Sequence, residues 1–280
     1  MNGETALITG SSSGIGLHLA HEFARHGHPL VLTAPVEAEL EQIAQELRRD
    51  RNVEVRVIAK DLEQENAPQE IFDELQRSGV QVDILVNNAG HGQTGKFWEI
   101  PLERHISIIR LNIDAVVRLT SLFLPPMIQR RHGRILNTAS VAGFEAGPLL
   151  AVYHASKAFV LSLTEALRVE LEEAGISVTA LCPGPTDTDF FPKADMVDTT
   201  VFQKGTVMAP QPVAEAGYKG LMEGDPIVVP GGMNKTLVFA RRFLTESAQA
   251  KLNKKFYEET PPEDRKRERG DVETAEAQKR

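Results

Sequence analysis

The stretch Thr5-Ala-Leu-Ile-Thr-Gly-Ser-Ser-Ser-Gly-Ile-Gly16 places a short apolar run directly before a glycine-rich turn. Apolar side chains at helical spacing follow it, from Leu19 to Ala24. This order suits the phosphates of a nucleotide, because glycines allow the tight turn and free N–H groups at a helix N-terminus attract negative charge. The alternative is a loop between strand and helix that binds no ligand, but the context on both sides favours a nucleotide. We expect the turn to contact it through Gly10, Ser12, Ser13, Gly14, Ile15 and Gly16.

Six more apolar, β-leaning runs follow, and helical patterns lie between them. The runs span residues 29–33, 53–59, 82–86, 133–138, 176–181 and 226–230. Strands that alternate with helices form a parallel sheet with helices on both faces. The sequence therefore predicts an α/β fold, a single doubly wound Rossmann-type domain with a central parallel sheet of about seven strands. Its ligand crevice should lie beyond the carboxyl ends of the strands.

Composition excludes several classes of protein. The formal net charge of −8 over 280 residues argues against a nucleic-acid partner, because binding to the phosphate backbone depends on clustered cations. The single cysteine, Cys182, excludes an internal disulfide, and the histidines show no metal-ligand spacing, so we expect no metal site. No apolar run approaches the ~18 residues of a spanning helix, so we expect no integral membrane segment. These features together favour a soluble, cytoplasmic protein.

The loop after the second predicted strand bears on cofactor choice. An acidic residue there would bind the ribose 2′-hydroxyl of NAD, and an arginine would bind the 2′-phosphate of NADP. This chain has Ala34 and Pro35, which permit NADP without anchoring it. After the third strand, Asp61 and Leu62 can cover an adenine edge, although Asp61 fits the start of a loop equally well. We favour NADP(H) modestly and keep NAD(H) as the alternative.

A second polar pattern is Tyr153-His-Ala-Ser-Lys157, in a segment whose apolar residues recur at helical spacing. A Tyr and a Lys four residues apart share a helix face, with Cβ atoms roughly 5–6 Å apart. A free phenol has a pKa of about 10, and a neighbouring ammonium lowers it by favouring the phenolate. The pair is therefore a candidate acid/base device, although the same spacing also occurs by chance on solvated helices.

The motifs together resemble the short-chain dehydrogenase/reductase family. They are Thr9-Gly-x-x-x-Gly-x-Gly16, Asn87-Asn-Ala-Gly90, Ser140 and Tyr153-x-x-x-Lys157, in the order and spacing of that family. The resemblance covers residues 5 to 231 and is to the shorter branch of the family. It implies an NAD(P)(H)-dependent oxidoreductase that interconverts a ketone or aldehyde and an alcohol.

The resemblance also implies roles for four catalytic residues. Ser140 would donate to the substrate oxygen, and Tyr153 would give that oxygen a proton or remove one. Lys157 would lower the tyrosine pKa and bind the nicotinamide ribose. Asn112 would kink its helix and hold a water that connects the lysine to solvent. Taken alone, Ser140 could simply cap a helix. Asn112 could likewise be a polar residue whose hydrogen bonds are satisfied within the helical region 102–131. We expect this helical region to break near Pro125 and Pro126.

Further cofactor contacts follow from the same resemblance. Amides and a glycine at the end of the fourth strand can tie neighbouring strands together and leave room for the cofactor, although a plain turn is the alternative. The stretch after the sixth strand would wall the nicotinamide. These contacts are Asn88, Ala89, Gly90, Tyr153, Lys157, Pro183, Gly184, Thr186 and Thr188.

The sequence divides into three parts. Residues 1–232 form the catalytic domain, in which 189–209 is a loose apolar segment expected either to cover an apolar carbonyl or alcohol substrate or to be ordinary packing. Residues 233–257 form an amphipathic helical extension. It would close the pocket, pack against a partner subunit or touch a membrane surface, and we favour packing. Residues 258–280 form a charged tail that we expect to be mobile.

Two expectations concern the whole protein. The resemblance implies a homodimer or homotetramer. The alternative to an enzyme is a nucleotide-sensing binding protein that keeps the fold without turnover. The complete set of Asn112, Ser140, Tyr153 and Lys157 weighs against that alternative, because binding alone needs no proton relay.

Overall fold

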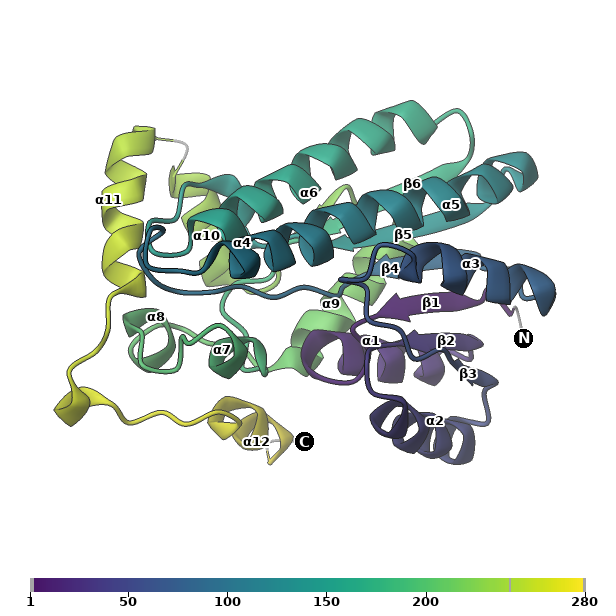
Figure 1. The fold of residues 1–280 in the computed structure, drawn as a ribbon, viewed down its shortest axis with the longest axis horizontal. Helices are drawn as coiled ribbons and strands as arrows, with labels where there is room; N and C mark the ends of the chain where they lie inside the picture. The colour runs from purple at the N-terminus through teal and green to yellow at the C-terminus, as the bar shows by residue number, and fades with distance from the viewer. Residues whose placement is uncertain (1–2, 242, 279–280) are drawn as a thin grey trace.

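Within the residues that the structure describes, 3–241 and 243–278, seven parallel strands form one sheet in the order β3-β2-β1-β4-β5-β6-β7. The structure is a computed structural model, shown in Figure 1. The strand order reverses between β1 and β4, and this confirms the doubly wound α/β fold. The strands are β1 (Ala6–Thr9), β2 (Leu30–Thr33), β3 (Val55–Val57), β4 (Ile84–Asn87), β5 (Gly133–Thr138), β6 (Ile176–Leu181) and β7 (Ile227–Val228).

Helices cover both faces of the sheet. The helices α1, α2 and α9 pack on one face, and α3, α5 and α6 pack on the other (Figure 1). The helices are α1 (Gly14–Arg25), α2 (Glu37–Arg51), α3 (Ala67–Arg77), α4 (Leu102–Ile109), α5 (Ala115–Arg130), α6 (Ala151–Leu171), α7 (Phe190–Lys193), α8 (Thr200–Gln203), α9 (Pro210–Glu223), α10 (Gly232–Arg241), α11 (Glu246–Tyr257) and α12 (Asp271–Ala277).

The core follows from the alternation of side chains along the strands. In β1, Ala6 and Ile8 face α1, α2 and α9, whereas Leu7 faces α3 and α5. All three are fully buried. Strands with apolar side chains on both faces are typical of parallel sheets between two helical layers. This packing holds the carboxyl ends of the strands in a fixed arrangement.

The predicted helical region 102–131 is interrupted at a different place from the one expected. A π-helical turn at Arg110–Asp114 separates α4 from α5 and contains Asn112. The expected break near Pro125 and Pro126 is wrong, because both prolines lie inside α5, which continues to Arg130. The interruption therefore falls at the asparagine, as the resemblance implies, and not at the helix-breaking residues.

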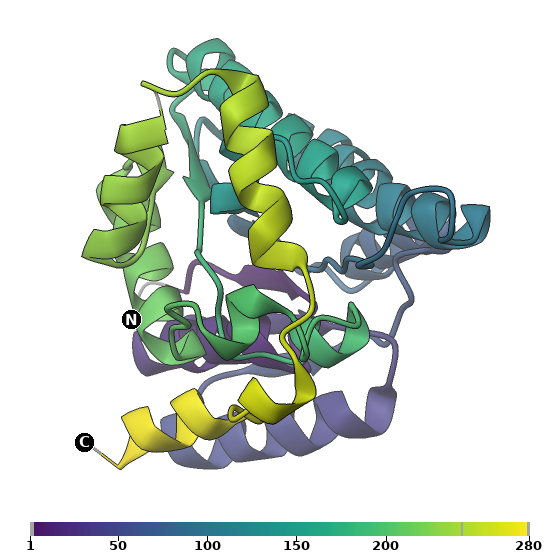
Figure 2. The same ribbon diagram turned by 90° about the vertical axis from the view of Figure 1, so that its left-hand side faces the viewer.

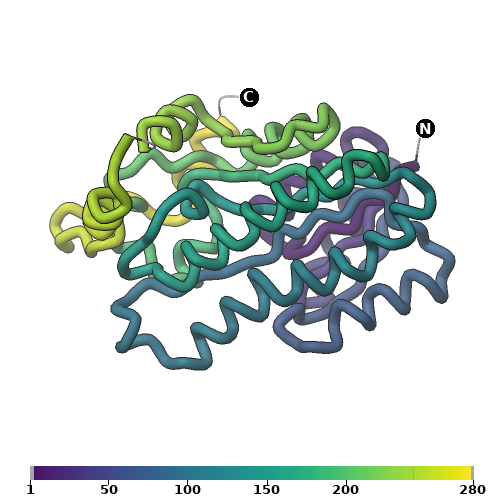
Figure 3. The backbone as a smooth tube through the Cα atoms, turned by 90° about the horizontal axis from the view of Figure 1, so that it is seen from above, coloured from purple at the N-terminus to yellow at the C-terminus, as the bar shows by residue number. Residues whose placement is uncertain are grey.

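The extension and the tail contain further helices. Two helices, α10 and α11, make up the extension and stand at the end of the molecule toward which the strands point (Figures 1 and 3). Residues 258–278, which we call the strap, run past α7 and α8 and end in α12, and the mobility expected of this tail stays a prediction (Figure 2). Parts of the predicted segments, residues 1–2, 242 and 279–280, lie outside the described residues. No helix in the described ranges is long and apolar enough to cross a membrane.

Candidate active site

A cavity of about 490 Å³ lies at the carboxyl ends of the strands, beside the point where the strand order reverses. Doubly wound sheets bind ligands at this point, and the volume is typical of ligand sites. The cavity brings together most of the predicted site residues. Those that line it are Gly10, Ser12, Ser13, Gly14, Ile15, Asp61, Leu62, Asn88, Ala89, Gly90, Ser140, Tyr153, Lys157, Pro183, Gly184, Thr186 and Thr188.

The glycine-rich turn is shaped by its backbone. Gly10 and Gly14 have φ values of 64° and 55°, in the left-handed region where a side chain would be strained. Gly16 does not line the cavity. A Cβ atom there would lie 2.1 Å from the carbonyl oxygen of Gly10 and 2.5 Å from Nδ2 of Asn88. Gly16 therefore allows α1 to pack closely against the ends of β1 and β4. Its position does not support the prediction that it contacts the ligand.

Hydrogen bonds fix the ends of β1 and β4 relative to each other. Thr9 Oγ1 accepts from the backbone N–H groups of Asn88 and Ala89, both at 2.9 Å, and donates to the carbonyl oxygen of Val86 at 3.2 Å. The Asn88 amide donates to the carbonyl oxygen of Thr9 at 3.0 Å. This confirms that the asparagine ties neighbouring strands together.

A second polar chain lies beneath the cavity. Asn87 Nδ2 donates to Asn137 Oδ1, and Asn137 Nδ2 donates to Thr164 Oγ1, both at 2.9 Å. All three side chains are buried. These bonds pair buried polar groups across β4, β5 and α6, although Asn87 Oδ1 has no hydrogen-bond partner among the described residues. The strand that leads to Ser140 is thereby tied to the helix that carries Tyr153 and Lys157.

The π-helical turn places Asn112 behind the cavity wall, where its side chain is buried. Its Nδ2 donates to the carbonyl oxygen of His91 at 3.0 Å and to Ser156 Oγ at 2.9 Å, and its Oδ1 accepts from the N–H of His91 at 3.1 Å. Ser156 Oγ in turn donates to the carbonyl oxygen of Tyr153 at 2.7 Å. Asn112 therefore links the end of β4 to the helix that carries Tyr153 and Lys157.

Tyr153 and Lys157 share the cavity-facing side of α6, with Lys157 Nζ 5.8 Å from the centre of the tyrosine ring. Burial raises the pKa of Tyr153 to about 12, while a hydrogen bond with Ser140 acts in the opposite direction. Burial also lowers the pKa of Lys157 to about 8. Lys157 Nζ donates to the carbonyl oxygen of Thr138 at 2.8 Å, so its position is fixed by β5.

Ser140 caps a short turn and also lines the cavity, and its role as a donor to the substrate stays a prediction. Its Oγ accepts from the N–H of Ala142 at 3.1 Å and so caps the short 3₁₀ turn Val141–Phe144. The same side chain lines the cavity and contacts Tyr153. Its hydroxyl donates to the carbonyl oxygen of Pro183 at 3.4 Å, a long bond that a better acceptor could replace.

At the other end of the cavity, the third strand leads to Asp61 and Leu62. Asp61 Oδ1 accepts from the N–H of Glu63 at 3.0 Å, so Asp61 does begin a loop while also lining the cavity. Lys60 lines it as well and pairs with Glu70 at 2.5 Å. Lys60 was not predicted as a site residue, although its place directly before Asp61 indicates that it lies at the same end of the cavity.

The segment 189–209, which we call the lid, forms its own apolar cluster beside the cavity. The Phe190 ring lies 5.0 Å from the Tyr153 ring, and Phe191, Met196 and Val201 are buried and line the cavity. The lid thus packs as an apolar cluster and also lines the cavity, while its covering of an apolar substrate stays a prediction.

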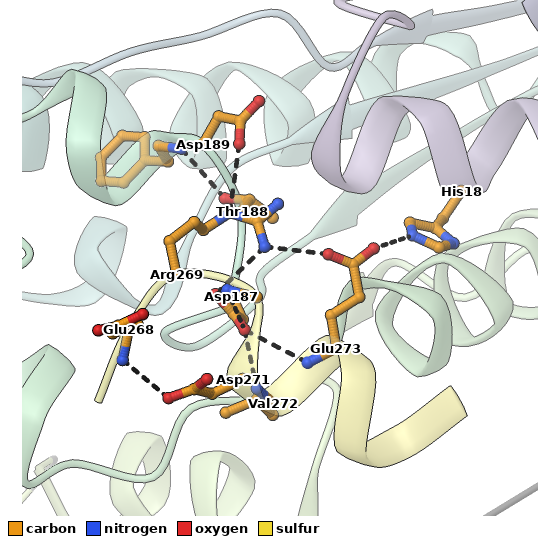
Figure 4. A network of polar contacts seen from close by, with 11 residues as sticks. His18, Asp187, Thr188, Asp189, Glu268, Arg269, Asp271, Val272 and Glu273 are labelled. Carbon is orange, nitrogen blue, oxygen red and sulfur yellow. Dashed lines mark hydrogen bonds and ion pairs between the residues drawn. The ribbon is translucent and has the colours of Figure 1, made fainter. Parts of the chain in front are cut away.

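The strap is held to the segment just before the lid by Asp187, which is fully buried. As Figure 4 shows, this carboxylate receives the backbone N–H groups of Gly270, Val272 and Glu273, at 2.9 to 3.3 Å. Arg269 lies between Asp187 and Asp189, at 3.4 and 3.2 Å, and Glu273 contacts His18 of α1 at 3.0 Å. The N-terminus of α12 is therefore capped by a residue some 80 positions earlier in the chain.

The comparisons with known proteins agree with this geometry. Residues 4–196 match the family described as short chain dehydrogenase. The oxidoreductase UcpA of Salmonella typhimurium is 40% identical over 187 residues, which are 66% of this chain and 70% of that protein. A short-chain dehydrogenase from Sphingobium yanoikuyae in complex with NADPH is 34% identical, with a TM-score of 0.77 over 85% of this chain and 93% of the other.

A third match is the bulky-bulky ketone specific alcohol dehydrogenase of Comamonas testosteroni. It is 32% identical, with a TM-score of 0.73 over 86% of this chain and 93% of that chain. The matched region contains the glycine-rich turn and the Tyr153-x-x-x-Lys157 motif, and the sheet is the one expected. This chain is therefore a member of the short-chain dehydrogenase/reductase family, an oxidoreductase family that uses nicotinamide cofactors.

Proposed function

We propose that this protein interconverts a ketone or aldehyde and an alcohol by hydride exchange with NADP(H). The observation that carries the proposal is that Ser140, Tyr153 and Lys157, from β5 and α6, meet in the cavity that the glycine-rich turn enters from the other side. Because a hydroxyl donor, a phenol and an ammonium converge there, the site offers both polarisation of a carbonyl oxygen and proton transfer to it.

The cavity fits a nicotinamide dinucleotide. The Gly10 and Gly14 backbones leave room for a pyrophosphate at the N-terminus of α1. The hydroxyl of Thr33, at the end of β2, is buried at the cavity wall and has no hydrogen-bond partner among the described residues, as expected of a group that awaits a ligand. A Cβ at Gly90 would lie 3.1 Å from Asn112 Oδ1 and 3.3 Å from Lys157 Nζ, so glycine keeps this wall open. When bound, the cofactor supplies or accepts the hydride.

The residues of the chain handle the proton. At neutral pH, the raised pKa of Tyr153 keeps its phenol protonated, which is the form needed to donate a proton to a carbonyl oxygen during reduction. Ser140 donates to the same oxygen. Lys157, whose pKa near 8 leaves it mostly charged at pH 7, favours the phenolate that forms and would bind the ribose hydroxyls. Asn112 would hold the water that resupplies the proton.

The substrate is proposed to be apolar. Leu150, Phe191, Met196 and Val201 line the part of the cavity near Tyr153. The named specificity of the Comamonas testosteroni relative for bulky ketones supports this class. The preference for NADP(H) rests on the absence of an acidic residue at Ala34 and Pro35. A cytoplasmic location and a homodimer or homotetramer stay predictions.

The test follows NADPH and NADH oxidation across apolar ketones, aldehydes and acyl-chain carbonyls. We expect turnover with NADPH, and we expect Tyr153→Phe to remove it while NADPH binding, measured by fluorescence, is retained. If Tyr153→Phe kept most of the turnover, the assignment of the proton donor would be wrong. If the wild-type protein bound NADPH but reduced nothing, the nucleotide-sensing alternative would be favoured. A clear preference for NADH would overturn the cofactor assignment.

A further inference from the structure

Tyr257, the last residue of α11, brings the C-terminal extension to the cavity. Among the described residues that follow Val201, it alone lines the cavity. The extension is held in place by an ion pair between Arg241 and Glu145 and by a hydrogen bond of 2.9 Å from Asn253 Nδ2 to the carbonyl oxygen of Ala146. These two contacts, both earlier in the chain than Tyr257, hold the extension beside the active site.

The hydrogen bonds of Tyr257 determine what its hydroxyl can offer. His154 Nδ1 lies 2.9 Å from the carbonyl oxygen of Glu145, which only accepts, so Nδ1 carries the proton. His154 Nε2, which lies 2.8 Å from Tyr257 Oη, is then an acceptor in the neutral ring, and the tyrosine O–H donates to it. Burial lowers the pKa of His154 to about 4, so the ring stays neutral at physiological pH.

The oxygen of Tyr257 therefore keeps unused acceptor capacity. Its only proton is committed to His154, and no group in the described part of the chain donates to it. Its ring packs beside the lid and lies in the same apolar cluster as Tyr153. A phenol oxygen that donates one hydrogen bond can still accept another, and a donor on the ligand would supply it.

The same arrangement of a carbonyl oxygen, a histidine and a tyrosine occurs at a second place in the fold, away from the cavity. His28 Nδ1 lies 2.9 Å from the carbonyl oxygen of Glu4, and its Nε2 lies 3.1 Å from Tyr218 Oη. Tyr218 packs between α1 and α9 and does not line the cavity. The two tyrosines thus share hydrogen-bond chemistry and differ in their access to the cavity, so Tyr218 is a matched control.

We propose that Tyr257 is a specificity-determining residue that accepts a hydrogen bond from a hydroxyl or amide N–H of the substrate, at a point away from the reacting carbonyl. The substrate class is then an apolar carbonyl compound with a second, hydrogen-bond-donating group. This inference rests on the proposed function, because it names what else the carbonyl substrate carries.

The experiment compares substrates that differ only in the donor. The probes are cyclohexanones with a hydroxyl or a methoxy group opposite the carbonyl, and acetophenones with a hydroxymethyl or a methoxymethyl group. We expect the hydroxyl members to have a KM about fivefold lower than the ethers, the size of one net hydrogen bond. In Tyr257→Phe this preference should vanish with little change in kcat. Tyr218→Phe should keep it.

The outcomes separate the inference from the proposed function. If the wild-type enzyme reduces the ketones without preferring the hydroxyl members, or if Tyr257→Phe keeps the preference, the inference is overturned and the function stands. If no ketone is reduced, the function fails, and the same pairs are then compared by thermal shift in the presence of NADPH. A larger shift with the hydroxyl members that Tyr257→Phe removes would support the contact, and equal shifts in both proteins would overturn it.

Discussion

Replacing Asp187 by alanine should loosen the end of the strap that contains α12. The carboxylate caps the N-terminus of α12 through three backbone N–H groups and also contacts Arg269. Since Asp187 is fully buried and its partners lie in residues 269–273, the substitution frees this end, while the earlier part of the strap keeps its own contacts with the lid, among them that of Arg265 with Asp198. The sheet and its two cores do not depend on this contact.

The magnitude follows from these contacts. Loss of a helix N-cap costs about 1–2 kcal/mol. The contact with Arg269 adds at most about 1 kcal/mol, because this side chain is one-quarter exposed and solvent screens it. Relief of the desolvation of the buried carboxylate offsets part of the loss. A net change of about 2 kcal/mol in the free energy of opening corresponds to roughly thirtyfold more frequent opening of this end of the strap.

Hydrogen–deuterium exchange with mass spectrometry measures this directly. Amides of residues 270–278 should exchange roughly thirtyfold faster in Asp187→Ala, while amides of β5 and β6 should be unchanged. Asp264→Ala is the control, since it removes an exposed ion pair of the strap with Lys204 and should leave exchange nearly unchanged. Unchanged exchange in Asp187→Ala would refute the reasoning, and so would strap amides that already exchange freely in the wild-type protein.

Three further predictions follow from other parts of the structure. Gly16→Ala should lower the free energy of unfolding by about 3 kcal/mol and Tm by roughly 6–12 °C, because the added Cβ would overlap backbone and side-chain atoms. Gly232→Ala is the control, since open space surrounds Gly232 and Tm should change little. Equal Tm values for the two variants would contradict this reasoning. Because burial lowers the pKa of His154 to about 4, the stability it contributes is complete above pH 6.5 and is lost as the pH falls toward 4, by about 3 kcal/mol. The raised pKa of Glu145 acts in the opposite direction, so the test is a flatter acid branch of the stability curve in His154→Gln, and identical curves would refute it. Asn137→Ala should cost about 1–3 kcal/mol in urea unfolding because it removes two buried hydrogen bonds, while Asn87 and Thr164 keep their contacts with Thr120 and Val160. A cost below about 0.5 kcal/mol would argue against the polar chain beneath the cavity.

Local sequence patterns were sufficient to predict the sheet and most of the residues that line the cavity. Each strand is a short apolar run, and several turns at carboxyl strand ends carry the small or polar residues that line the cavity. Parallel topology brings these ends together whatever the loops do, so Gly10, Gly90 and Ser140 could be placed at one crevice without coordinates. Their chemical roles remain predictions, since proximity alone does not establish a reaction.

Contacts between distant segments were not predictable. Nothing near Asp187 in the sequence marks it as a helix cap, because the helix that it caps begins more than 80 positions later. The strap therefore looked like a charged tail with no apolar face. Tyr257 was likewise one aromatic residue among several on an amphipathic segment, and only the fold shows that it reaches the cavity beside Tyr153.

The π-helical turn at Arg110–Asp114 has a consequence for chain length. A π turn holds one residue more than an α turn, and each α-helical residue advances by about 100° around the axis. Deleting one residue of the turn would therefore leave an α turn of about the same rotation, and α4 and α5 would join into one regular helix with their buried faces still in phase. The face of α5 that carries Phe123 and Met127 would stay on the sheet, whereas the bulge that brings Asn112 to His91 and Ser156 would be lost. A deletion of one residue here should therefore spare the packing of α4 and α5 and remove the contacts of Asn112.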